Sequence, residues 1–227
     1  MWIYYVLFIL VLVILYITSN PNYKGWVGEK QVEKVLKDCA LKYGGLEFRD
    51  FMFEDDKSSS QLDNMLLTQK ALYVIEVKNY NGHIFGSEEN LNWTVTVKHV
   101  NKKRSKSGKT YKKTSISKHK FYNPLKQNKT HINKIKNLTN ISNEIPVFNI
   151  VLFGKKAYLR DVTHSSSVYV VHYSELKGLI NKLEEGIETQ IDLEVQSDFV
   201  DVIYDINIVD KKRRKGHVKN LKEKYKK

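Results

Sequence analysis

Three charged residues lie in segments that otherwise have the composition of β-strands. They are Asp63, Glu76 and Lys78, and an apolar residue precedes each of them. Side chains alternate along a strand, so Glu76 and Lys78 share one face, while Ile75 and Val77 point to the other face, toward a core. Two carboxylates beside an ammonium group could hold a divalent cation and act on a phosphate ester.

The position of Asp63 relative to Glu76 depends on the turn between the two strands. If Gln69-Lys70 is a two-residue hairpin loop, Asp63 lies directly opposite Glu76, although Gln-Lys is a poor sequence for the tight primed turns of hairpins. Two carboxylates facing each other repel, and burial makes them harder to ionise. A hard cation such as Mg²⁺ or Mn²⁺ relieves both effects. The alternative is a surface hairpin with an Asp or Glu to Lys ion pair worth about 0–1 kcal/mol.

The elements around these residues predict a mixed α/β domain with one central sheet flanked by helices. Glu29 falls at the edge of the apolar stripe of a first helix, and Asn123-Pro124 has the composition of a cap and first helical residue. Ser174 is a candidate cap for a later helix. The sequence favours helices at 25–40, from 124 and at 175–184, strands at 48–53, 62–68, 72–79, 93–97, 147–153 and 167–172, and either state at 191–209.

Four sequence blocks resemble the nuclease-related domain family. Their order and spacing match that family over roughly residues 20–140. The blocks are Gly25-Trp26-Val27-Gly28-Glu29, Gln61-Leu62-Asp63, Val74-Ile75-Glu76-Val77-Lys78-Asn79-Tyr80-Asn81-Gly82 and Asn123-Pro124-Leu125-Lys126-Gln127-Asn128. The resemblance implies the restriction-endonuclease-like fold of the PD-(D/E)XK superfamily and Mg²⁺-dependent cleavage of DNA.

The same resemblance implies roles for five residues of this chain. Asp63 and Glu76 would be metal-binding carboxylates, and Lys78 the catalytic lysine. Glu29 would be the acidic residue of the first helix and a further metal or water ligand, and Gln127 a polar residue of the later helix that faces the site. The sequence departs from the family at position 64, where Asn stands in place of a frequent His, which removes a possible extra base.

The N-terminus has the composition of a membrane anchor. Residues 2–17 are sixteen consecutive apolar or aromatic residues, close to the length of a spanning helix. No Lys or Arg precedes the run and no small-residue cleavage site follows it, which favours an uncleaved anchor at residues 1–19 over a signal peptide. The nearest lysines follow the span, so the positive-inside rule predicts a single-pass protein of the cell membrane with its body in the cytoplasm.

Basic residues concentrate in two segments. The formal net charge is +13, yet residues 98–136 hold fourteen Lys or Arg and no acid, and residues 211–227 hold ten and one acid. We expect a loop at 98–120 that follows a nucleic-acid backbone, and a tail that binds the same polyanion or anionic lipid. The alternative for each is a solvated charge run. The candidate nucleic-acid ligands are Lys102, Lys103, Arg104, Lys106, Lys109, Lys112 and Lys113.

Other classes of protein fit the sequence poorly. A single cysteine excludes an intrachain disulfide framework and a cysteine-based zinc site. The sequence also lacks H-E-x-x-H and a phosphate-binding Gly-rich loop, which argues against a zinc hydrolase or an NTPase.

We therefore expect three regions: an anchor at 1–19, a nuclease domain at 20–185 with its motifs at 25–140, and an extension at 186–227 with a basic tail at 211–227. The leading hypothesis is a membrane-anchored, cytoplasm-facing endonuclease that uses Mg²⁺ or Mn²⁺ and acts on DNA, with RNA left open. The alternatives are a non-catalytic, membrane-tethered nucleic-acid-binding module on the same scaffold, and a membrane-surface scaffold whose tail binds lipid.

Overall fold

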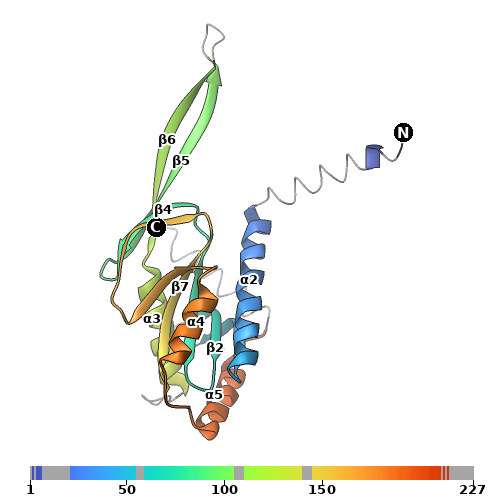
Figure 1. Cartoon of the computed structure of the whole chain (residues 1–227), viewed down its shortest axis with the longest axis vertical. Coiled ribbons are helices and arrows are strands. Elements are labelled where there is room, and N and C mark those ends of the chain that lie inside the picture. The colour runs from blue at the N-terminus through green and yellow to red at the C-terminus, as the bar shows by residue number, and fades with distance from the viewer. Residues whose placement is uncertain are drawn as a thin grey trace.

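The strands of the domain form two mixed sheets, with helices covering both faces of the larger one (Figure 1). The structure is a computed structural model. It describes residues 2, 4–6, 21–54, 59–104, 110–139, 145–210, 212 and 214. The prediction of an α/β domain is confirmed, but the prediction of one central sheet is wrong. The chain leaves the first sheet after Lys78 and enters the second at Gly82. The φ of Gly82 is +120°, and a Cβ there would lie 2.3 Å from the carbonyl oxygen of Thr96.

The larger sheet has the strand order β1-β2-β3-β7-β9. β1, β2 and β3 are antiparallel, whereas β7 and β9 extend the sheet in parallel with β3. The central strand β3 is therefore buried on both faces, which explains its nearly continuous apolar sequence. The strands span Leu46–Glu54, Ser59–Leu67, Leu72–Lys78, Val147–Phe153 and Val168–His172 in chain order.

Two helices cover each face of this sheet. α2 (Pro21–Lys42) and α4 (Leu176–Glu185) bury apolar residues against one face, where Tyr73 and Ile75 of β3 point. α3 (Pro124–Thr139) and α5 (Leu193–Ile206) cover the other face, where β3 presents Leu72 and Val74. The alternation of side chains along β3 thus supplies both halves of the core.

The turn between β2 and β3 has the predicted register. Asn64 pairs with Ile75 and Leu67 with Leu72, with Gln69-Lys70 at the turn. The hydroxyl of Thr68 accepts hydrogen bonds from the backbone N–H groups of Lys70 and Ala71. This side-chain hydroxyl stabilises the turn without the Asn-Gly sequence that primed turns require.

The smaller sheet has the order β6-β5-β4-β8 and carries the basic segment. Its strands are β4 (Gly82–Ser87), β5 (Asn92–Arg104), β6 (Thr110–Tyr122) and β8 (Ala157–Thr163). The prediction of a loop at 98–120 is wrong, because its described residues belong to the hairpin of β5 and β6. This hairpin projects from the body (Figure 1). The strand pattern is absent from the sequence because an arm exposed on both faces has no reason to alternate apolar with polar residues.

The C-terminal helices differ from expectation in detail. α4 is preceded by Glu175 at its N-cap position, so the predicted Ser174 cap is wrong. The ambiguous segment at 191–209 contains α5, which Asp192 caps by accepting a hydrogen bond from the N–H of Glu194. α5 adds Phe199 and Ile203 to the core over β1 and β2. The domain boundary at residue 185 stays a prediction.

The predicted anchor at 1–19 lies almost entirely outside the described residues, as does most of the basic tail after residue 210. Among the residues that the structure describes, no helix is long and apolar enough to cross a membrane.

Asn123 joins the smaller sheet to α3. Its side-chain oxygen accepts hydrogen bonds from the N–H groups of Leu125 and Lys126, which confirms the predicted cap. Its amide nitrogen donates to the carbonyl oxygens of Ser87, Glu88 and Asn90 in the turn that follows β4.

We expect Asn123→Ala to lower the free energy of unfolding by about 2–4 kcal/mol, because it removes a helix cap and a fully buried amide that donates to three carbonyl groups. Denaturant unfolding measures this change. The matched control is Asn133→Ala on the exposed side of the same helix, which we expect to be nearly neutral. Equal effects of the two substitutions would contradict this role for Asn123.

Candidate active site

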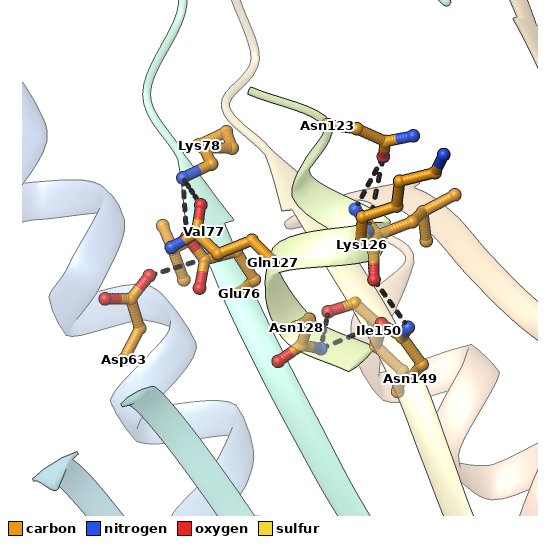
Figure 2. Close-up of polar contacts among 11 residues, drawn as sticks. Asp63, Glu76, Val77, Lys78, Asn123, Lys126, Gln127, Asn128, Asn149 and Ile150 are labelled. Atoms are coloured by element: carbon orange, nitrogen blue, oxygen red, sulfur yellow. Dashed lines mark hydrogen bonds and ion pairs between the residues drawn. The ribbon is translucent and has the colours of Figure 1, made fainter. Parts of the chain in front are cut away.

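The carboxyl end of β3 holds a buried ion pair. The side chains of Glu76 and Lys78 are 4% and 18% exposed, and the ammonium group of Lys78 contacts Oε1 of Glu76 at 2.5 Å. Gln127 of α3 accepts a second hydrogen bond from Lys78 at 3.0 Å (Figure 2). Glu76 and Lys78 therefore share one face of β3, as predicted. Gln127 lies beside them, as the sequence resemblance implies.

Asp63 lies at the edge of β3, where β2 separates from it. The last ladder pair before this point is Asn64 with Ile75. Beyond it, the carboxylate of Asp63 accepts the N–H of Val77 at 2.8 Å (Figure 2). Asp63 thus satisfies a backbone donor that the departing strand leaves open, and this bond fixes its carboxylate beside Glu76.

Two buried amides hold α3 over the site. Asn128 donates to the carbonyl oxygen of Val74 at 2.8 Å and to the side-chain oxygen of Asn149 at 2.9 Å. Asn149 in turn donates to the carbonyl oxygen of Leu125. These bonds tie the first turns of α3 to β3 and β7 (Figure 2), so the position of Gln127 is set by its neighbour in the sequence. Asn128 belongs to the fourth sequence block, but its role was not predictable from the sequence.

A polar cavity of about 460 Å³ lies on the α2 side of β3. Glu29 and Asp63 both line it, together with Val77, Lys30 and Arg49. Glu76 and Lys78 point from the opposite face of β3 toward α3. Asp63 therefore lies between two groups: the cavity with Glu29 on one side, and Glu76 with Lys78 and Gln127 on the other.

The three candidate carboxylates do not form one cluster. Within the described ranges, no three His, Cys, Asp or Glu side chains gather closely enough to hold a metal ion. This corrects the expectation that Glu29, Asp63 and Glu76 form one set of ligands. The physical reason is that Glu29 is exposed on α2, across the cavity from the strand that carries Glu76.

Burial dominates the electrostatics of the two central carboxylates. Desolvation raises the pKa of Glu76 to about 7, and the charge of Asp63 adds to the increase. Desolvation also raises the pKa of Asp63, against the hydrogen bond from Val77 and the charge of Lys78, which lower it. A divalent cation would favour the ionised form of both groups, so the pair has the chemistry of a cation site.

Tyr173 is a neighbour of the site that the sequence analysis missed. Its hydroxyl donates to the side-chain oxygen of Asn79 at 3.1 Å, and burial together with the charges of Glu29 and Asp63 raises its pKa. A Cβ at Gly28 would lie 2.6 Å from its ring. The glycine next to Glu29 was the available signal, because it permits this close approach of a side chain to α2.

Comparison with known proteins identifies the family. The sequence model of the nuclease-related domain matches residues 24–154, more than half of the chain. The chain belongs to the nuclease-related domain family. This family is part of the PD-(D/E)XK nuclease-like superfamily, so the predicted resemblance is confirmed.

Two further similarities accompany the family match. An uncharacterized protein of Bacillus anthracis is 31% identical over 210 residues, which cover 90% of this chain and 87% of the relative. The structure of Can2 from Sulfobacillus thermosulfidooxidans in complex with cyclic tetra-adenylate matches 70% of this chain with a TM-score of 0.32 and 16% identity. The match covers 37% of the Can2 chain.

The raised pKa of Glu76 predicts a pH-dependent stability. Because the pKa in the folded state lies above the usual 4.5, Glu76 contributes stability below about pH 4.5 that is lost as the pH rises through 7. In EDTA, we expect the unfolding temperature of the wild type to fall relative to Glu76→Gln between pH 5 and pH 8. If the unfolding temperatures of the two proteins changed in parallel with pH, the raised pKa of Glu76 would be contradicted.

Proposed function

We propose that this nuclease-related domain is a metal-dependent endonuclease that hydrolyses phosphodiester bonds in DNA. The observation that carries the proposal is the set of side chains at the carboxyl end of β3. Asp63 and Glu76 are two partly desolvated carboxylates beside the ammonium group of Lys78. Perturbed carboxylates next to a cationic group, at the edge of a polar cavity, are typical of active sites.

The residues present fit Mg²⁺ or Mn²⁺. Mg²⁺ in phosphoryl-transfer sites is commonly bound through one or two carboxylates, and water and substrate phosphate oxygens complete its coordination. Asp63 and Glu76 would supply these carboxylates, and Glu29 would act from across the cavity on the surrounding water. When bound, the cation would polarise a phosphoryl oxygen and lower the pKa of a water molecule.

Lys78 and Gln127 act on the negative charge of the substrate in this proposal. The ammonium group of Lys78 donates hydrogen bonds to Glu76 and Gln127, so these two side chains orient it before substrate binds. It would position the attacking water and stabilise the negative charge that develops on the phosphoryl oxygens. Gln127 is a positioning residue, because its side chain forms hydrogen bonds with Lys78 and Glu76.

Cleavage of plasmid and linear DNA by the full chain, with Mg²⁺, Mn²⁺ or EDTA, tests the proposal. We expect metal-dependent cleavage that Glu76→Gln and Lys78→Met each lower by about 100-fold or more. The matched controls are Glu89→Gln and Lys134→Met, which lie outside the proposed site and should keep wild-type rates. Cleavage that survives Glu76→Gln would refute the site. Binding of DNA without cleavage in any metal would instead support the non-catalytic module.

Membrane anchoring is a separate proposal that rests on the sequence of residues 1–19 and on the lysines that follow them. It places the nuclease domain at the cytoplasmic face of the cell membrane, with the basic tail near anionic lipid. We expect the full chain to stay with membranes after a carbonate wash and a chain that lacks residues 1–19 to be released. Release of the full chain under the same wash would refute the anchor.

A further inference from the structure

The arm formed by β5 and β6 carries its positive charge mainly on one face. Residues that pair directly across an antiparallel ladder share a face, so the register assigns each side chain of the hairpin to one of two faces. One face, here called the basic face, contains Lys98, Lys102, Arg104, Lys112, Lys118 and Lys120. The opposite face, over the same length, contains Lys103 and Lys113 as its Lys and Arg residues.

The charge of the basic face is not balanced from within the arm. Residues 98–120 contain ten Lys or Arg and no Asp or Glu. Lys102 pairs directly with Lys112, and both are exposed. Like charges at directly opposite positions destabilise a ladder. The repulsion would be relieved by a polyanion lying along this face.

The shape of the arm fits a duplex groove. The seven pairs from Lys98 with Ile116 to Arg104 with Thr110 lie beyond the buried base. At about 3.3 Å per residue they extend roughly 20 Å from the body. The major groove of B-form DNA, about 12 Å wide, admits a two-stranded ribbon, whereas the major groove of A-form RNA is too deep and narrow.

The apolar side chains on the basic face favour a duplex over a single strand. Val100 and Ile116 are 53% and 66% exposed there. From the pair of Thr94 with Lys120 outward to the pair of Arg104 with Thr110, its other described members are Lys, Arg and Thr, and the aromatic Tyr122 lies on this face only at the base of the arm. Single-strand binding relies on aromatic rings that stack on bases, while small apolar side chains contact thymine methyl groups in the major groove.

The base of the arm is fixed to the candidate active site. Trp93 is fully buried, and Phe121 packs against Tyr80 with ring centroids 4.3 Å apart. Tyr80 follows Lys78 by two residues. β6 continues through Asn123 directly into α3, which carries Gln127. A duplex held by the arm would therefore have a set position relative to these side chains.

We propose that the arm places its basic face in the major groove of duplex DNA and so makes double-stranded DNA the substrate of this domain. The part of this inference that concerns the substrate rests on the proposed nuclease function. The groove contact itself depends on the arm alone.

Matched double variants of the full chain test this inference. Lys102→Gln with Lys112→Gln removes two charges from the basic face, and Lys103→Gln with Lys113→Gln removes two charges from neighbouring positions on the opposite face. Binding to a labelled 30-base-pair DNA duplex is measured in EDTA by fluorescence anisotropy across a salt series. Duplex RNA and single-stranded DNA of the same sequence are measured in parallel.

We expect the first variant to bind duplex DNA about tenfold more weakly and to lower the slope of log K against log salt concentration by about 2, because two phosphate contacts are lost. The second variant should lose less than about threefold, because its two lysines face away from the DNA. The wild type should prefer duplex DNA to the other two nucleic acids by about tenfold or more.

Equal losses in the two variants, or equal binding of the three nucleic acids, would overturn the inference. A variant of the basic face that loses binding to phosphatidylserine vesicles while keeping duplex binding would assign the arm to lipid instead. Cleavage is scored separately with Mg²⁺. A wild type that shows the expected binding and no cleavage would refute the proposed nuclease and leave the groove contact standing.

Discussion

The structure depends on the burial of one carboxylate in the central strand. Glu76 is 3% exposed, and an isolated ionised carboxylate in that position would be strongly unfavourable. The ammonium group of Lys78 compensates it directly, and Gln127 shares that ammonium group from the neighbouring helix. The position of β3 is therefore linked to that of α3, because the buried charge of Glu76 and its partner Lys78 is shared with a residue of this helix.

The polar contacts around this site connect the two sheets. Asn128 and Asn149 fasten α3 to β3 and β7, while Asn123 fastens the start of the same helix to the turn after β4. Asn123 and Asn149 donate to carbonyl groups in the turn after β4 and in the first turn of α3, and Asn128 donates to a carbonyl group within β3. The larger sheet, α3 and the smaller sheet consequently form one polar framework around the end of β3.

Local signals in the sequence predicted much of this arrangement. The alternation of Glu76 and Lys78 with apolar residues, the two-residue turn before β3, and the Asn-Pro start of α3 are short-range patterns, and the structure confirms them. The division into two sheets was not predictable in this way, since it depends on the change of direction at Gly82 and on pairing with the distant strand β8. The side of β3 on which the cavity opens likewise depends on contacts between residues far apart in the chain.

The arm has a consequence for how such chains can diverge. Buried contacts of the hairpin end near Val95, and its outer pairs touch solvent on both faces. Insertions or deletions of matched residue pairs beyond that point would change its reach by about 7 Å per two added pairs without altering the core. Related chains can therefore vary the length of this ribbon as an independent module, while the buried carboxyl end of β3 stays under its own, much stricter packing constraints.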